Sequence, residues 1–246
     1  MRLNFKFSQT RIRNVCHELI DKVDLYFENE ISDKQQHTSE KSIQNTDAPN
    51  ILPRILRYFS QHDDLQLVTG DKKRLDGAIS ATFPLINRII ILKEEYNQIR
   101  FSDSFWLPAI ITHEIGHWVL HAPVFKQFRR QLDLFEDCKI CSSFDEITDL
   151  HPSDLNLFDQ QANHFARELL LPEDKIQKAL QQLGYYPPVI YREHHLNLMP
   201  FEEYCTRLAE KAHAVLQVPI PWLHFRMLEL NIVQNRATTE TVIQTS

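Results

Sequence analysis

The chain has 246 residues, of which 43% are hydrophobic and 24% charged, and its formal net charge is −6. That length suffices for one sizeable domain with a buried core, and the acidic balance argues against non-specific binding to nucleic acid or to an anionic membrane. The stretch MRLNFKFSQTRIRNVC has no apolar core, no run reaches the ~20 apolar residues of a membrane span, and four cysteines are too few for a disulfide scaffold. We therefore expect a cytoplasmic protein without a signal peptide.

The predicted elements are mostly helical. Apolar residues recur at helical spacing in residues 11–30, which predicts an amphipathic helix, and the polar stretch 32–50 predicts a linker. Between residues 65 and 92, the segments LQLVTG, GAISATFP and NRIIIL are rich in β-branched residues and predict strands. Residues 185–200 are interpreted as a loop. Further helices are predicted near 51–61, 105–121, 153–171, 173–183, 201–216 and 219–231.

The stretch ITHEIGHWVLH, residues 111–121, contains the pattern H-E-x-x-H at His113, Glu114 and His117. Positions i and i+4 lie on one face of a helix, so the two imidazoles can bind one Zn²⁺ at ~2.0–2.1 Å. Glu114 is rotated by about 100° from His113, a position that suits a general base acting on a metal-activated water. Gly116 would let another backbone approach closely. The alternatives are a chance match and a structural histidine pair.

A third metal ligand has two candidates. Along a straight helix, His121 lies ~12 Å from His113, which is too far for both to bind one tetrahedral ion. We therefore interpret His121 as a residue that supports the ligands or packs beside them. Asp159 lies in an apolar helical stripe with Ala162 and Ala166, where an isolated carboxylate is costly and a cation would compensate it. The alternative for Asp159 is a carboxylate favoured by the dipole at a helix N-terminus.

Two further residues of the same helix are assigned by their angular position. Asn163 lies one turn after Asp159 and could orient a ligand through a hydrogen bond. Glu168 lies about 180° round the helix from Asp159 and is expected to face solvent.

The pair Cys138-Lys-Ile-Cys141 has metal or redox spacing. It could be a regulatory thiol pair or an additional zinc site with His151, and the simpler alternative is two unremarkable thiols.

The segment HEIGHWVLH, followed downstream by DQQANHFARELLLP, resembles the ImmA/IrrE family of bacterial zinc metallopeptidases over roughly residues 65 to 235. That family shows H-E-x-G-H followed by E-x-x-A-N-x-F-A-x-x-L-L-x-P. The matching residues are His113, Glu114, Gly116 and His117 for the first motif, and Ala162, Asn163, Phe165, Ala166, Leu169, Leu170 and Pro172 for the second.

The resemblance implies that His113, His117 and Asp159 hold Zn²⁺ and that Glu114 is the general base. The family usually has Glu at the third ligand position, and the side chain of Asp159 is shorter by one methylene. Either the helix lies closer to the metal, or the site is weakened or lost. A donor for the transition state would come from Tyr191, or from Arg192, His194 or His195 beside it, and the sequence does not select among them.

The resemblance also implies an α+β fold, mostly helical, with a small sheet packed beside the H-E-x-x-H helix in a zincin-like way. We divide the chain into an N-terminal helix and linker (1–50), a zinc metallopeptidase-like domain (51–235) and a flexible tail (236–246). The strand NRIIIL could be an edge to which an extended peptide adds, although a core strand is the simpler interpretation.

The expected function is that of an intracellular zinc-dependent endopeptidase that cleaves a regulatory protein, such as a co-encoded transcriptional repressor. Many family members carry a helix-turn-helix, but none is recognised in residues 1–60, so we expect no direct contact with nucleic acid and none with a membrane. The alternative is a catalytically weak or inactive protein of the same fold that acts as a partner-binding or metal-sensing module.

Overall fold

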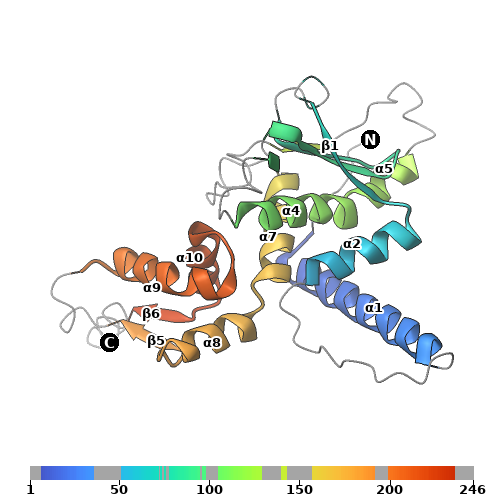
Figure 1. The fold of residues 1–246 in the computed structure, drawn as a ribbon. Helices are drawn as coiled ribbons and strands as arrows, with labels where there is room; N and C mark the ends of the chain where they lie inside the picture. Colours follow the sequence, from blue (N-terminus) through green and yellow to red (C-terminus); the bar gives the residue numbers. More distant parts are fainter. Residues whose placement is uncertain are drawn as a thin grey trace.

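A computed structural model describes residues 7–35, 51–71, 73, 75, 78–94, 96–97, 105–128, 140–142, 157–191 and 199–235. Over these residues the fold is α+β and mostly helical with a small sheet, as predicted (Figure 1). The helices are α1 (Gln9–Gln35), α2 (Ile51–His62), α4 (Trp106–Leu120), α5 (Ala122–Phe128), α7 (Leu157–Leu170), α8 (Glu173–Gln182), α9 (Phe201–Leu216) and α10 (Ile220–Glu229). The strands are β1 (Gln66–Gly70), β2 (Ser80–Phe83), β3 (Arg88–Leu92), β4 (Ile140–Ser142), β5 (Val189–Tyr191) and β6 (Val233–Asn235). None of the described helices is long and apolar enough to cross a membrane.

The larger sheet has the strand order β1-β3-β2-β4. Strand β3 runs parallel to β1 and antiparallel to β2, and Ala81 of β2 lies opposite Ile90 of β3 and Cys141 of β4. Ile89 and Ile91 join the main core while Ile90 joins a smaller cluster, as the alternation of side chains along a strand requires. The interpretation of NRIIIL as a core strand is confirmed, and the suggestion that it forms an edge is wrong, because β3 has a neighbour on each side.

Helix α4 is buried between the sheet and α7 (Figure 1). It is apolar almost all round, which is the pattern of a helix with no solvent face, and Ile110 and Ile115 have no exposed surface. The polar residues of its H-E-x-x-H motif are therefore held inside the core.

Helix α1 confirms the predicted amphipathic pattern. Its buried residues Ile12, Cys16, Leu19 and Val23 belong to the same hydrophobic cluster as those of α4 and α7, and α1 packs against α7. The prediction that a linker begins at residue 32 is wrong for residues 32–35, because α1 continues to Gln35. The rest of the predicted linker and the predicted tail lie outside the described residues, and the division of the chain at residue 50 stays a prediction.

The C-terminal part contains α8, α9, α10 and the parallel pair β5–β6 (Figure 1). Gly184, with φ of 82°, follows the end of α8, a position that favours glycine. The interpretation of residues 185–200 as a loop is wrong for residues 189–191, which form strand β5. The sequence does not indicate this strand, because three residues are too short to show a periodic pattern.

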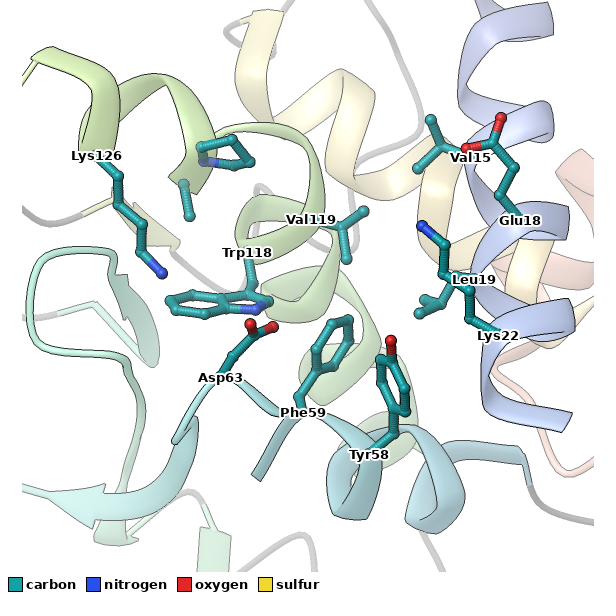
Figure 2. Close-up of a pocket in the computed structure, with 12 residues that line it drawn as sticks. Val15, Glu18, Leu19, Lys22, Tyr58, Phe59, Asp63, Trp118, Val119 and Lys126 are labelled. Atoms are coloured by element: carbon teal, nitrogen blue, oxygen red, sulfur yellow. The ribbon is translucent and has the colours of Figure 1, made fainter. Parts of the chain in front are cut away.

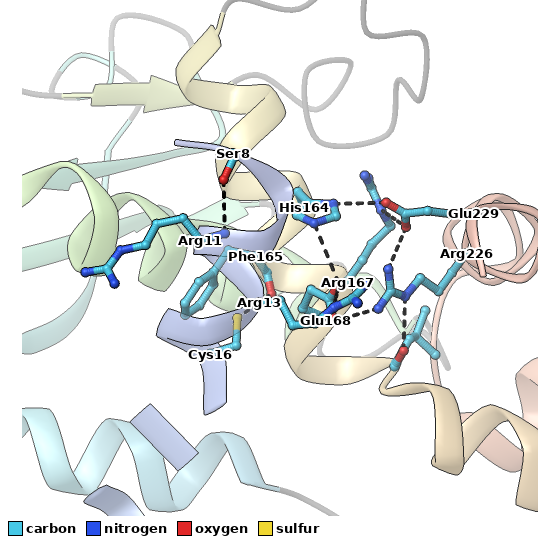
Figure 3. A network of polar contacts seen from close by, with 11 residues as sticks. Ser8, Arg11, Arg13, Cys16, His164, Phe165, Arg167, Glu168, Arg226 and Glu229 are labelled. Atoms are coloured by element: carbon cyan, nitrogen blue, oxygen red, sulfur yellow. Dashed lines mark hydrogen bonds and ion pairs between the residues drawn. The ribbon is translucent and has the colours of Figure 1, made fainter. Parts of the chain in front are cut away.

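A buried ionic cluster joins α7 to α10 and α1 (Figure 3). Arg226, 1% exposed, places Nη2 at 2.7 Å from Glu168 Oε2 and Nη1 at 2.7 Å from Glu229 Oε2. His164 Nδ1 lies 3.0 Å from Glu229 Oε1. From α1, Arg13 Nε lies 3.2 Å from Glu168 Oε1. The charges are thus paired across three helices.

This cluster corrects the expectation that Glu168 faces solvent. Glu168 does lie away from the face that carries Asp159, but it is only 7% exposed. Helices α1 and α10 supply the arginines that contact it, and so they cover the side of α7 that the sequence leaves to solvent.

Arg226→Met should lower the free energy of unfolding by about 3–5 kcal/mol, because it leaves two carboxylates buried with their main cation removed. The matched control is Arg13→Met, since Arg13 contacts the same Glu168 but has a side chain that is 49% exposed; its loss should be about 0–1 kcal/mol. Urea denaturation measures both, and equal losses would contradict the assignment of Arg226 as the cluster's central cation.

The same cluster predicts an acid dependence of stability. Burial by itself raises the pKa of Glu229, but the hydrogen bond from His164 and the charges of Arg167 and Arg226 outweigh it and lower the pKa from 4.5 to about 2. A lowered carboxyl pKa stabilises the fold above pH 4.5, and that contribution is lost as the pH falls towards about 2. Glu229→Gln should therefore show a shallower loss of unfolding free energy over this pH range, measured by denaturant titration, and an unchanged slope would count against it.

Candidate metal centre

Three donor atoms from α4 and α7 converge in the core. His113 Nε2 lies 3.0 Å from His117 Nε2, and Asp159 Oδ1 lies 3.6 and 3.2 Å from these two nitrogens. A tetrahedral zinc site with bonds of ~2.0–2.1 Å places neighbouring donor atoms about 3.3 Å apart. Within the described part of the chain, these residues are the one group of His, Cys, Asp or Glu side chains that could hold a metal ion. Their spacing and donor set fit Zn²⁺.

The convergence depends on how closely α7 approaches α4. His113 and His117 share one face of α4, and Asp159 lies in the first turn of α7. Between them, a Cβ on Gly116 would lie only 3.0 Å from the Cα of Ala162. The predicted close approach of a second backbone at Gly116 is confirmed, and it brings the short side chain of Asp159 within reach of both imidazoles.

Asn163 supports the first histidine. Its Oδ1 lies 2.8 Å from His113 Nδ1, and because an amide oxygen only accepts, Nδ1 carries the proton. In its neutral form, His113 then directs the lone pair of Nε2 towards His117 and Asp159. The sequence predicts this contact, and the orientation of a metal ligand by Asn163 stays a prediction.

His121 is not part of the donor triangle, in agreement with the prediction. Its Nδ1 lies 3.0 Å from Nδ1 of His117, and its Nε2 lies 2.9 Å from Gln161 Oε1. Burial lowers the pKa of His121 to about 4, so its ring is neutral at neutral pH. Gln161, 3% exposed, was not singled out from the sequence, because a glutamine on a helix carries no pattern that indicates a buried contact.

The charge states of the triangle suit a cation. Burial lowers the pKa of His117 to about 3, despite the opposing effect of the nearby Asp159 carboxylate. Burial also raises the pKa of Asp159, but its contacts with the two histidines outweigh this and hold that pKa well below its usual range. In His113 the effect of burial is outweighed by Asp159, which raises the pKa. At neutral pH Asp159 is therefore an ionised carboxylate and His117 a neutral imidazole, and both forms ligate metal. The raised pKa of His113 favours a ring proton that metal binding would displace.

Glu114 lies beside the triangle and is held by β2. Ser80 Oγ donates to Glu114 Oε1 at 2.7 Å, and Thr82 Oγ1 lies 2.6 Å from Glu114 Oε2. All three side chains are fully buried. Sequence reasoning missed Ser80 and Thr82, although two hydroxyl residues two positions apart in a predicted buried strand must share a face.

Among the candidates for the transition-state donor, the described residue Tyr191 is not part of the donor triangle. Tyr191 is buried in β5, donates its hydroxyl hydrogen bond to the carbonyl of Met199 and packs its ring against Phe201 and Tyr204. Cys141 lies in β4. The remaining candidates lie outside the described residues: Cys138, His151, Arg192, His194 and His195.

A pocket of ≈ 340 Å³ lies between α1, α2, α4 and α5 (Figure 2). Its lining includes Leu19, Tyr58, Phe59, Trp118 and Lys126, and none of the site residues named above. Lys126 Nζ lies 3.9 Å from the centre of the Trp118 ring. The pocket is therefore separate from the donor triangle.

No protein-family model, curated protein or solved structure matches this chain. Function is therefore inferred from the geometry of the site and from the sequence motifs.

Gly116→Ala tests the close approach. Helix propensity alone would stabilise this variant by about 1 kcal/mol, whereas overpacking against the α7 backbone costs about 1–3 kcal/mol. We expect a less stable protein. Its zinc affinity should fall by about tenfold, the lower end of the effect seen when groups that position metal ligands are changed. Denaturation and competition with a chromogenic chelator measure the two effects.

Gly184→Ala is the control, because a Cβ there meets nothing within 4 Å although φ is 82°. It should lose about 1–2 kcal/mol through backbone strain and bind zinc as the wild type does. A Gly116→Ala protein that is more stable than wild type with unchanged zinc affinity would contradict the role given to this glycine.

Proposed function

We propose that this protein is an intracellular zinc-dependent endopeptidase, with His113, His117 and Asp159 as zinc ligands and Glu114 as general base. The observation that carries the proposal is the triangle of donor atoms, which lie 3.0, 3.2 and 3.6 Å from one another. The carboxylate of Glu114 lies beside this triangle and is not one of its three donors. That combination is what metal-assisted hydrolysis requires: an open ligand position and a separate base. The zincin-like packing of α4 beside the sheet is part of the same proposal.

The chemistry is divided between the ion and the chain. When bound, zinc would supply Lewis acidity towards a water molecule and a peptide carbonyl. Glu114 would take the proton from the attacking water and return it to the leaving amine. A carboxylate has about four acceptor sites, so the hydroxyls of Ser80 and Thr82 can fix its orientation while acceptor capacity remains for water. The burial of the site would strengthen each of these interactions.

The short side chain of Asp159 is compatible with this role. Of the two possibilities raised by the sequence, the approach of α7 at Gly116 favours a helix that lies closer to the metal over a site that is lost. Oδ1 reaches both imidazoles without the extra methylene of a glutamate.

The proposed substrate is a regulatory protein, and a transcriptional repressor encoded nearby is the first candidate. This part of the proposal follows from the motif resemblance to ImmA/IrrE metallopeptidases, together with the acidic net charge of −6, which favours a protein over nucleic acid as the partner.

One observation favours a second candidate, a catalytically weak module that senses metal or binds a partner. His113, Glu114, His117 and Asp159 all have 0% of their surface exposed. Both oxygens of Glu114 already accept hydrogen bonds. A site so enclosed could hold an ion as a structural or sensing element without admitting a peptide.

Metal analysis and cleavage assays on the purified protein separate the two. We expect roughly one equivalent of zinc, retained in Glu114→Gln and lost in His113→Ala. His62→Ala, in an exposed residue of α2, is the control and should keep the metal. With a substrate that the wild type cleaves, first sought among repressors encoded nearby, Glu114→Gln should slow cleavage by about 10²–10⁴-fold.

Each alternative result has a distinct meaning. Wild-type protein without zinc would overturn the metal centre. Zinc binding without cleavage by the wild type would favour the module, and cleavage that survives Glu114→Gln would exclude Glu114 as the base.

A further inference from the structure

The donor triangle is extended by a chain of hydrogen bonds that ends at Gln161. It runs from His117 Nδ1 to His121 Nδ1 at 3.0 Å, and from His121 Nε2 to Gln161 Oε1 at 2.9 Å. His117 and His121 lie one turn apart on α4, whereas Gln161 comes from α7. All three are buried, with exposed fractions of 0, 0 and 3%, so solvent offers little competition for these hydrogen bonds.

The orientation of the Gln161 amide, whose oxygen faces His121, gives the chain its direction. The oxygen of the Gln161 amide can only accept, so His121 Nε2 carries a proton. A neutral imidazole has one N–H, so His121 Nδ1 is an acceptor. His117 Nδ1 must therefore donate, and its Nε2 is left with a lone pair.

That lone pair lies where the proposed zinc would bind, 3.0 Å from His113 Nε2 and 3.2 Å from Asp159 Oδ1. If the Gln161 amide presented its NH₂ group instead, the direction of the chain would reverse and His117 Nε2 would carry a proton. A protonated nitrogen cannot ligate a metal.

We infer that Gln161 is a positioning residue that, through His121, sets the tautomer of the ligand His117 and so its readiness to bind metal. The inference rests on the proposed zinc site and adds a distant determinant to it. It parallels the role of Asn163, which fixes His113 directly, and so each histidine ligand has its own amide oxygen supplied by α7.

The surroundings of His121 hold the relay in place. The ring of Phe158 meets that of His121 edge-on, with centroids 4.8 Å apart at 88°, and Phe7 approaches at 6.2 Å. These contacts are apolar and offer the imidazole nitrogens no alternative partner, so Gln161 and His117 determine where the protons of His121 lie.

Four variants separate a relay from simple packing. Gln161→Met keeps the length of the side chain but removes the acceptor, whereas Gln161→Glu keeps the acceptor. His121→Phe keeps an aromatic ring between Phe7 and Phe158 but breaks the relay. Gln160→Met, at the neighbouring position of α7, is the control.

The first measurement is made on metal-free protein. Long-range ¹H–¹⁵N spectra of the histidine rings distinguish the two neutral tautomers. We expect His117 as the Nδ1–H tautomer in wild type, Gln161→Glu and Gln160→Met, and a mixture of tautomers in Gln161→Met. A single, unchanged His117 tautomer in Gln161→Met would overturn the inference.

The second measurement is the affinity for Zn²⁺ alone, by competition with a chromogenic chelator. Gln161→Met should bind about 10–100-fold more weakly, as for other residues that orient metal ligands, and Gln161→Glu should bind at least as tightly as wild type. In the His121→Phe background, Gln161→Met should have no further effect, because the relay is already broken. Additive losses in the double variant would show packing and not a relay.

The two proposals fail in different ways. If Gln161→Met changes the tautomer of His117 but wild-type protein binds no zinc, the zinc peptidase is wrong while the tautomer control by Gln161 stands. If zinc binds normally and Gln161→Met changes neither the tautomer nor the affinity, the metal centre stands and the relay is wrong.

Discussion

The contact on which the rest of the structure depends is the close approach of α7 to α4 at Gly116. A Cβ atom there would lie 3.0 Å from the Cα atom of Ala162. The two helices are therefore packed at a distance that leaves no room for a side chain at residue 116. At that separation an aspartate reaches two imidazoles on the facing helix. The same separation lets Asn163 and Gln161 reach the histidines of α4. The absence of a side chain at Gly116 thus makes room for the contacts between α7 and the histidines of α4.

That interior is costly unless each polar group is paired. The histidines are matched to amide oxygens or to each other, and Glu114 is matched to two hydroxyls of β2. Helix α7 contributes to two such sets: Asp159, Gln161 and Asn163 meet α4, while Glu168 and His164 join the ionic cluster with α10. Since α7 is anchored on both sides, we expect little freedom in the position of Asp159.

The sequence predicted the parts of the site that depend on spacing within one helix. The pairing of His113 with His117, the position of Asn163 and the need for Gly116 all follow from helix geometry and were confirmed as contacts. Most of the elements were also predicted, because long amphipathic segments and β-branched runs are strong local signals.

The residues that sequence reasoning missed are those whose role depends on a neighbour from elsewhere in the chain. Gln161 and Ser80 have no motif, and become part of the site only when α7 and β2 pack on α4. Glu168 was assigned to solvent because its partner Arg226 lies 58 positions along the chain, where no local pattern indicates it. The interior position of β3 likewise depends on the pairing of β1 and β2, which the segment NRIIIL does not encode.

The most direct test of the metal centre is an anomalous difference map, recorded at the zinc absorption edge from crystals of the zinc-loaded protein. The account predicts one strong peak in the core, within ~2.0–2.3 Å of Nε2 of His113, Nε2 of His117 and a carboxylate oxygen of Asp159. Zinc-loaded crystals with no peak between α4 and α7, or with Asp159 turned away from both imidazoles, would contradict it.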